Sequence, residues 1–348
     1  MSVVIVLGGV GPDRFSVAVA PLPELAACLH VLTGPDHHTE HARWVDEVTR
    51  AAPPAFRAGL RRFAPLWNAL RWRGFYPGLD GPDLDTFAEL TAYTCASGYS
   101  GFDFGRVLRD PRQAALLRQT ASRLPEPHLR LADDLLRDAE AVRADLHAFV
   151  DLCRDVFFAD LWARTEPLLT AAGHRVRQRL ADQGPAAALL SLSPSGARLV
   201  TPATGPARVV FDKVHHAVVS PARTPVTLIP TRYGAPHLLV KNEPGLAPVV
   251  HFPVDAPDVG VTLARSRLLG LTDPRRVRLC RLIARQAMTT ADLADRLSMT
   301  RPQVSRHLRV LRDLGLVRVE RNGRYVHYGL DLAAVERIGQ DVATALQY

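Results

Sequence analysis

The side chains with the clearest chemistry are arginines gathered toward the C-terminus. Residues 265–330 contain 15 arginines, no lysine and five acidic residues, whereas residues 1–264 carry equal numbers of basic and acidic side chains. The guanidinium group makes paired hydrogen bonds to phosphate and to guanine bases. A basic segment of domain size in an otherwise neutral chain indicates a surface for a polyanion, with a solvated surface without a partner as the alternative.

Helix-starting signals precede two helices in this basic segment. Asp273 followed by Pro274 predicts an N-cap and a first helical residue, opening a helix over residues 275–285. Thr289 or Thr290 is expected to cap a short second helix. These helices would support the basic residues that follow them.

A third helix is predicted to begin after Thr300, with Gln303 at the reciprocal position of a capping box. Its apolar residues recur at helical spacing, so one face would be buried and polar side chains would point away from it. The buried stripe consists of Val304, Leu308 and Leu311. The side chains expected to reach DNA are Arg301, Gln303, Ser305, Arg306 and Arg309.

A hairpin is expected after Gly315, with strands at residues 317–321 and 324–328 joined by Asn322–Gly323. Two short helices, a turn and a basic hairpin make a winged helix-turn-helix. A helix fits the major groove of B-DNA, and its N-terminal side chains reach base edges. The hairpin would place Arg321 and Arg324 against phosphates or in the minor groove.

The basic segment resembles the ArsR/SmtB family of bacterial repressors over about residues 265–345. The matching runs are Leu271–Leu279, Thr290–Leu297, Val304–Val317 and Arg321–Tyr328. The resemblance implies a homodimer, built through the first helix and a C-terminal helix over Leu332–Leu346, that binds double-stranded DNA at a two-fold symmetric operator. By position, Arg301, Ser305 and Arg306 match residues that face DNA in the family.

The family's metal sensing is not expected here. Its sensors place cysteine ligands in the helix before the turn, or aspartate and histidine ligands on the last helix. This chain has Ala291–Asp295 at the first place and no histidine or cysteine in the second. Cys280 is isolated on an apolar face and is expected in the core. We therefore expect a non-metal member without a cofactor.

The remaining sequence predicts an α+β protein. Residues 1–184 are expected to form a mainly helical sensor domain that begins with strand-like runs at 3–7 and 15–19, and residues 185–260 a small antiparallel sheet packed on it. Pro253–Gly260 is a predicted linker, and the winged helix is expected to span residues 265–348. The first part also resembles helix-rich regions fused to such winged helices in bacterial regulators, which implies sensing or support of a dimer.

Aromatic side chains are concentrated in residues 44–104, which hold 12 of them. Such a density can line a cavity for an apolar or aromatic small molecule, or can be ordinary core packing, and both interpretations stay open. The residues predicted to contact such a ligand are Trp67, Trp72, Tyr76, Tyr93 and Tyr99.

Other motifs are weaker. The glycines of Gly8–Gly11 are not followed by the last glycine or the helix that a dinucleotide-binding fingerprint requires. Gly98–Gly101 lacks the final glycine of a nucleophile elbow. His37 and His41 are spaced as metal ligands on one helix face, but a third ligand is not evident, and a solvated helix start is preferred.

No apolar stretch approaches the roughly 20 residues of a membrane span, and a cytoplasmic location is expected. The favoured hypothesis is a homodimeric transcriptional repressor that is not an enzyme and senses a small molecule or a protein partner. The alternatives are an enzyme domain fused to a DNA-binding module, and a repressor that senses metal through histidine.

Overall fold

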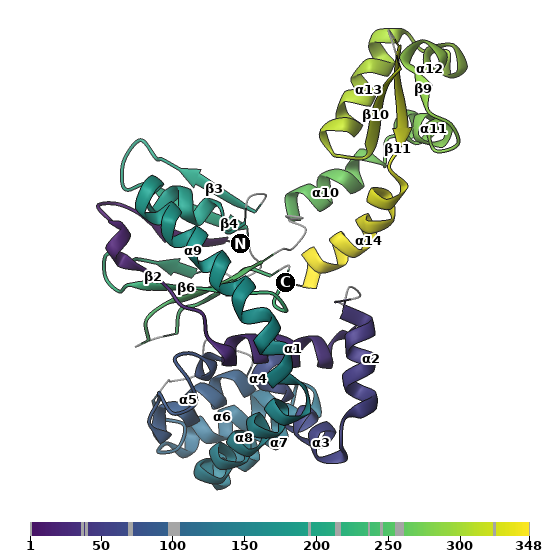
Figure 1. Cartoon of the computed structure of the whole chain (residues 1–348). Coiled ribbons are helices and arrows are strands. Elements are labelled where there is room, and N and C mark those ends of the chain that lie inside the picture. Colours follow the sequence, from purple (N-terminus) through teal and green to yellow (C-terminus); the bar gives the residue numbers. More distant parts are fainter. Residues whose placement is uncertain are drawn as a thin grey trace. The chain divides into compact units, whose positions relative to one another are not determined.

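The chain folds into two compact units (Figure 1). Unit 1 comprises residues 1–211 and 215–257, and unit 2 comprises residues 258–348 with the short stretch 212–214. The computed structural model describes residues 2–35, 38, 41–68, 72–96, 105–193, 196–212, 217–235, 237–243, 246–254, 261–322 and 325–347. Within these residues, no helix has the length and apolar character needed to cross a membrane. Most of the expected linker Pro253–Gly260 lies outside them.

The first part of unit 1 is a helical layer, as the sequence predicts, and most of its helices start at proline or aspartate. Asp83, Asp110 and Asp138 cap three of them by accepting backbone hydrogen bonds, and proline occupies the first turn of four. The helices are α1 (Pro21–Thr33), α2 (Ala42–Ala51), α3 (Pro54–Arg62), α4 (Ala64–Asn68), α5 (Leu84–Cys95), α6 (Pro111–Ala121), α7 (Glu126–Arg137), α8 (Ala139–Cys153) and α9 (Ala159–Leu190).

Apolar residues recur at helical spacing from Leu131 to Val156, which would be typical of one long helix. The structure instead has two helices and a π-helical turn in this stretch. The chain breaks at Asp138, which has extended backbone angles, ends α7 and caps α8 through a hydrogen bond from the Ala141 backbone N–H. A π-helical turn, Arg154–Phe158, then joins α8 to α9. Aspartate is favoured at a helix start over a helix interior, because its side chain accepts hydrogen bonds from nearby backbone N–H groups. The chain therefore starts a new helix at Asp138, although the apolar spacing continues through it.

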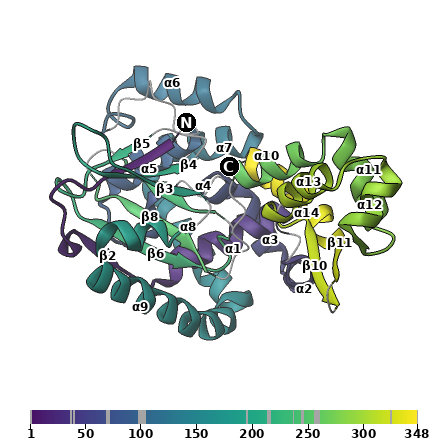
Figure 2. The same ribbon diagram turned by 90° about the horizontal axis from the view of Figure 1, so that it is seen from above.

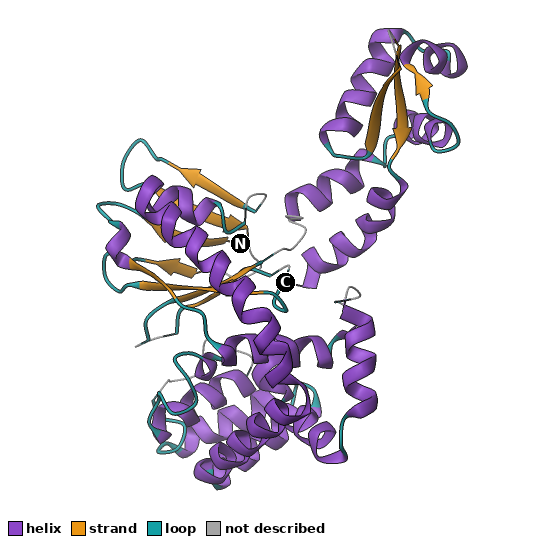
Figure 3. Ribbon diagram, viewed as in Figure 1, coloured by secondary structure: helices purple, strands orange, loops and turns teal. Residues whose placement is uncertain are grey.

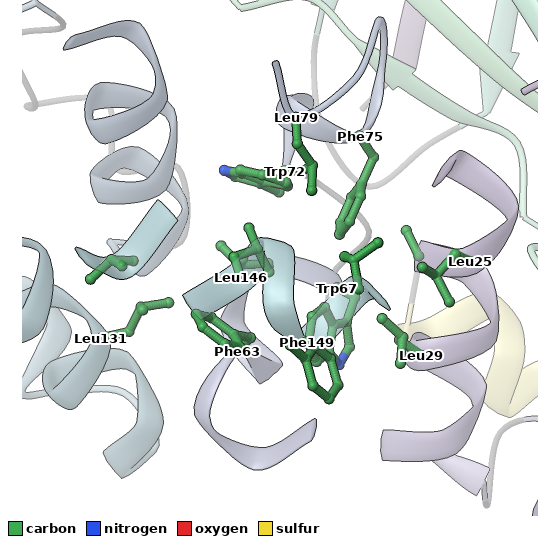
Figure 4. Packing of buried hydrophobic residues seen from close by; sticks show 14 of the residues in the cluster. Leu25, Leu29, Phe63, Trp67, Trp72, Phe75, Leu79, Leu131, Leu146 and Phe149 are labelled. Carbon is green, nitrogen blue, oxygen red and sulfur yellow. The ribbon is translucent and has the colours of Figure 1, made fainter. Parts of the chain in front are cut away.

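A dense aromatic core lies between these helices (Figure 4). The Trp67 and Phe149 rings stack with centroids 5.7 Å apart, and the Trp72 ring meets Phe75 edge to face at 4.7 Å. Trp67 and Trp72 are fully buried. Large rings in such contacts make this core sensitive to any added volume.

The second part of unit 1 contains two four-stranded sheets (Figure 3). One has the order β3-β4-β1-β5 and the other β2-β6-β8-β7. Their strands are β1 (Ser2–Val6), β2 (Phe15–Val17), β3 (Ala197–Val200), β4 (Arg208–Asp212), β5 (Ala217–Val219), β6 (Val226–Thr231), β7 (Leu239–Lys241) and β8 (Val249–Pro253). Together with the helical layer, they confirm the predicted α+β class.

Parallel pairing is the main departure from the expected antiparallel sheet. The N-terminal strands β1 and β2 run parallel to β5 and β6, and β6 runs parallel to β8. Antiparallel pairs are formed by β3 with β4 and by β7 with β8. Parallel neighbours need a long crossover, and here the whole helical layer lies between β2 and β6 in the sequence. Local pattern does not reveal which distant strands become neighbours.

One buried carboxylate joins the helical layer to the second sheet. Glu24 of α1 accepts hydrogen bonds from the Thr231 hydroxyl (2.6 Å) and from the backbone N–H groups of Arg232 (3.0 Å) and Tyr233 (2.9 Å). Burial raises the pKa of Glu24, and these three hydrogen bonds oppose that rise. The turn after β6 is thereby fixed to α1.

Unit 2 contains five helices and a three-stranded sheet within the described residues (Figure 2). The antiparallel sheet has the order β10-β11-β9, and α10 packs against α14. The elements are α10 (Val261–Gly270), α11 (Pro274–Ile283), β9 (Met288–Thr289), α12 (Thr290–Leu297), α13 (Arg301–Asp313), β10 (Val317–Asn322), β11 (Tyr325–Leu330) and α14 (Leu332–Gln347). The sequence does not predict α10, because its apolar residues are spread around the helix.

Gly59 allows α3 to approach the aromatic core. A methyl group there would lie 2.2 Å from the Phe149 ring, which is buried against Trp67. Alanine is a better helix former than glycine by about 1 kcal/mol, yet we expect Gly59→Ala to lower the free energy of unfolding by about 1–3 kcal/mol through overpacking. All four tryptophans lie in unit 1, so urea unfolding followed by tryptophan fluorescence measures this change.

A Phe149→Ala background provides the control. With the ring removed, Gly59→Ala should become neutral or stabilising. Equal destabilisation in both backgrounds would show that the contact with Phe149 is not the cause.

Candidate nucleic-acid interface

The turn between α12 and α13 is built from local signals. Thr289 caps α12 in a capping box with Asp292, and Ser298 ends that helix in the left-handed conformation with φ of 53°. Thr300 then caps α13, and its backbone N–H donates to Gln303 Oε1 at 3.0 Å. Each hydrogen bond satisfies a backbone group that a helix end leaves unpaired, which fixes the angle between the two helices.

The buried face of α13 is the one that the sequence predicts. Val304, Leu308 and Leu311 are almost completely buried in a core that α11, α12 and α14 share. Arg301, Gln303, Ser305, Arg306 and Arg309 are all exposed on the same helix. The helix therefore presents polar and cationic side chains to solvent over two turns, on a rigid apolar support.

Two polar residues of α13 have protein partners. The Gln303 side chain accepts the capping hydrogen bond, and it lines a cleft of about 270 Å³ together with Arg275 and Arg278 of α11. His307 is partly buried, and burial lowers its pKa while Asp273 opposes that shift. It lies near the start of α11, where Asp273, Arg275 and Arg276 act on its pKa.

The hairpin is held at its base by the helix-turn-helix. β10 pairs with β11 from Val317↔Leu330 to Asn322↔Tyr325, and β11 pairs with β9 through His327↔Thr289. Gly315 ends α13 with φ of 67°, a conformation that glycine adopts without strain. The side chain of Arg321 and the whole of Arg324 lie outside the described residues.

Several arginines of the basic segment hold unit 2 together. Arg276 donates through Nε to the Gly270 carbonyl at 2.6 Å and through Nη2 to that of Leu269 at 3.2 Å. Arg267 Nε donates to the Leu314 carbonyl at 3.0 Å, at the end of α13. These side chains cap helix ends, so the sequence count of arginines overstates the charge that is available to a partner.

The aromatic residues proposed for ligand binding lie in or beside the core of unit 1. Trp67 and Trp72 are fully buried, and Tyr93 packs partly buried against the same core. Tyr76 follows the 3-10 turn Arg73–Phe75, and Tyr99 lies outside the described residues. The two tryptophans are therefore part of the packed core, and their contact with a ligand stays a prediction.

A cleft of about 400 Å³ lies elsewhere in unit 1. It is lined by the start of α1, the segment Pro77–Gly81, α8 and the π-helical turn. The charged side chains on its wall are those of Asp80, Asp151 and Arg154, with His147 beside them. No local sequence pattern indicates this cleft, because its walls come from four separate segments.

The histidines of unit 1 are arranged differently from the predicted pair. His37 lies outside the described residues, and the His41 ring stacks on Tyr233 with centroids 4.5 Å apart. The buried residues His30, His38 and His237 instead bring nitrogen atoms within 4.8 Å of one another. The distance along the chain from α1 to His237 hides this group from motif searches.

Comparison with known protein families matches a separate model to each part of the chain. Residues 1–258 match the model described as "Family of unknown function (DUF5937)". The chain belongs to this family. Residues 271–320 match a model described as "Helix-turn-helix domain". The family region thus corresponds to unit 1, and the helix-turn-helix match lies within unit 2.

Two curated proteins are similar to the C-terminal part. The "Transcriptional repressor SmtB homolog" of Synechocystis sp. (strain ATCC 27184 / PCC 6803 / Kazusa) is 40% identical over 77 residues, which are 22% of this chain and 58% of that protein. The "Transcriptional repressor SdpR" of Bacillus subtilis (strain 168) is 26% identical over 66 residues, which are 19% of this chain and 73% of that protein. The predicted ArsR/SmtB-like helix-turn-helix is confirmed.

Asp273 offers a test of how the interface is supported. Its carboxylate accepts hydrogen bonds from the backbone N–H groups of Arg275 (2.9 Å) and Arg276 (3.0 Å), and chiefly the latter lowers its pKa. Asp273→Ala should destabilise α11 by about 1 kcal/mol, whereas Asp273→Asn should retain the cap. Hydrogen exchange of the α11 amides, compared between variants at one pH, measures the difference.

The pH dependence of this cap has a defined sign. A carboxylate with a lowered pKa stabilises the fold fully above its unfolded pKa of about 3.9, and the stabilisation is lost as the pH falls through the folded value. Wild type should therefore lose α11 protection relative to Asp273→Asn at pH 3 but not at pH 6. If the difference in α11 amide protection between wild type and Asp273→Asn were the same at pH 3 and pH 6, the ionised side chain would not be the stabilising form.

Proposed function

We propose that this protein is a homodimeric transcriptional repressor that binds double-stranded DNA through unit 2 and senses a signal through unit 1. The observation that carries the proposal is the set of exposed polar side chains on α13, which stands on a buried apolar stripe within an ArsR/SmtB-like helix-turn-helix. A regulator of this kind needs no catalytic residues.

The exposed face of α13 fits the requirements of the major groove. Arg301 and Arg306 lie in its first two turns, where side chains of a docked helix reach base edges, and each can donate two hydrogen bonds to guanine. Ser305 lies between them as a smaller donor and acceptor. Arg309 lies further along, and Arg321 and Arg324 of the hairpin would contact phosphates or the minor groove.

The cleft beside Gln303 supports a phosphate contact. Arg275, Arg278 and the turn Ser298–Met299 form its walls, next to the N-terminus of α13. Backbone N–H groups and two guanidinium groups at one place attract an anionic oxygen. A contact of this kind fixes the register of the helix on DNA but carries no sequence information.

The resemblance implies a dimer through the first predicted helix, which is α11, and the C-terminal helix α14. We propose instead that α10, which precedes α11, forms the interface together with α14. The two helices pack together, and α10 exposes Leu268 (47%) and Leu269 (49%), while α14 begins with Leu332 (48%). Burial of such leucines against a second copy would be favourable, at roughly 25 cal/mol per Å². A two-fold dimer would present two copies of α13 to a two-fold symmetric operator.

Regulation would arise from a signal bound by unit 1, either a small molecule or a protein partner. The cleft of about 400 Å³ beside the π-helical turn is a candidate site for a small ligand. Binding would favour a dimer geometry in which the two recognition helices no longer match successive major grooves, and DNA would be released.

Substitutions in α13 test DNA recognition. Arg301→Ala and Arg306→Ala should each remove about 1–3 kcal/mol of base discrimination, or roughly fivefold to more than 100-fold in specific affinity. The measurement is a gel-shift titration with a duplex selected from a random pool by the wild-type protein. Arg179→Ala removes the same charge from the exposed surface of α9 and should leave retention unchanged. Unchanged retention by both α13 variants would refute the assignment.

Substitutions in α10 test the dimer. Leu268→Glu with Leu269→Glu should give a monomer in sedimentation velocity, because two charges would be buried at the interface. Affinity for the full operator should fall strongly, while the weak affinity for a half-site should remain. Leu199→Glu, at a leucine of β3 that is 46% exposed, provides the control. A dimer that survives the double change would place the interface elsewhere.

A further inference from the structure

Unit 1 contains a buried group of three histidines from separate parts of the chain. His30 belongs to α1, His38 lies between α1 and α2, and His237 lies between β6 and β7. Each is at least 95% buried, and each offers a ring nitrogen such that the three atoms lie within 4.8 Å of one another. We propose that His30, His38 and His237 bind one divalent transition-metal ion of the zinc class.

The hydrogen bonding of His30 favours a metal ligand. Its Nδ1 lies 3.1 Å from the Trp67 carbonyl oxygen, and a carbonyl only accepts hydrogen bonds. Nδ1 therefore carries the proton in the neutral ring, and the lone pair is on Nε2. A metal-bound histidine commonly has this arrangement, in which a backbone carbonyl fixes the tautomer and the orientation of the ring.

The three rings lie close to one another. Their centroids are 5.1, 5.6 and 6.1 Å apart, and each pair is close to perpendicular, at 81–84°. Nitrogen ligands of a tetrahedral zinc ion lie roughly 3.4 Å apart, given Zn–N distances of about 2.0–2.1 Å. The present separation of at most 4.8 Å exceeds this spacing, so we expect the side chains to move closer together when the metal binds.

Backbone hydrogen bonds hold the segments that carry the three histidines. Glu24 fixes the turn after β6 to α1, and the His237 N–H donates to the Gly234 carbonyl at 2.9 Å. The His38 N–H donates to the Pro35 carbonyl at 3.0 Å. One ligand therefore comes from a long helix, and the other two come from short turns that this helix helps to hold.

The choice of metal follows from the donor set. Among the described residues, the group contains imidazole nitrogens and no carboxylate or thiolate. Imidazole suits Zn²⁺, Co²⁺, Ni²⁺ and Cu²⁺, whereas Mg²⁺ and Ca²⁺ prefer oxygen ligands. Three protein ligands leave a fourth position for water or a small ligand. The site differs from the positions at which the ArsR/SmtB resemblance would place a sensor metal, and it does not depend on DNA binding.

The test uses the full chain after removal of metal with a chelator. Titration with Co²⁺ should produce the visible absorption bands of a low-coordinate site, with a break at one ion per chain. Competition of Zn²⁺ with a chromophoric chelator then gives the affinity. His38→Asn and His237→Asn should each weaken Zn²⁺ binding by about 100-fold, since each removes one of three ligands.

His174→Asn is the matched control, because it removes an exposed histidine from α9 and should retain full affinity. Circular dichroism and tryptophan fluorescence establish that each variant is folded. Wild-type binding weaker than that of free imidazole, or unchanged affinity in the folded His38 and His237 variants, would overturn the proposal.

Two measurements on the wild-type protein remain decisive if the variants do not fold. X-ray absorption of the Zn²⁺-loaded chain should show a shell of nitrogen and oxygen atoms with imidazole scattering. A shell dominated by sulfur would overturn the proposal. Zn²⁺ should also raise the urea midpoint of unit 1, because binding to the folded state alone stabilises it. An unchanged midpoint at saturating Zn²⁺ would likewise overturn it.

Discussion

The buried carboxylate of Glu24 is the interaction on which unit 1 depends. A carboxyl group in an apolar interior is costly unless it is hydrogen-bonded, and Glu24 accepts hydrogen bonds from the Thr231 hydroxyl and two backbone N–H groups. The bond fixes α1 to the turn after β6. Both the aromatic core and the group of three histidines include residues of α1, so this connection contributes to the position of both.

Unit 2 achieves its rigidity by a different route, through helix ends. Capping boxes at Thr289 and Thr300 orient α12 and α13, and Arg276 and Arg267 bind the carbonyls at the ends of α10 and α13. The basic character of the segment therefore has two roles. Some guanidinium groups stabilise the fold, and those on the exposed face of α13 are open to solvent, as the proposed contact with DNA requires.

The features that the sequence predicts correctly depend on interactions between residues that are close together in the chain. The N-caps, the stripe of α13 and the hairpin rest on contacts within a few residues, and the structure has them as expected. The sequence pattern does not predict the break at Asp138, because the apolar spacing continues through the capping residue. It does not predict α10 either, because the apolar residues of that helix do not lie on one face. The parallel pairing of β1 and β2 joins strands separated by about two hundred residues, which no local signal encodes.

The sequence by itself determined the fold class, the winged helix, and which side chains of α13 are buried and which are exposed. Short-range hydrogen bonds and helical periodicity are sufficient for these features. Only the tertiary structure decided that Trp67 and Trp72 belong to the core and that His38, not His41, joins His30 and His237. The reason is physical: burial and ligand geometry depend on which distant segments meet, and in unit 1 that meeting is set by the long-range bond of Glu24 to the turn after β6.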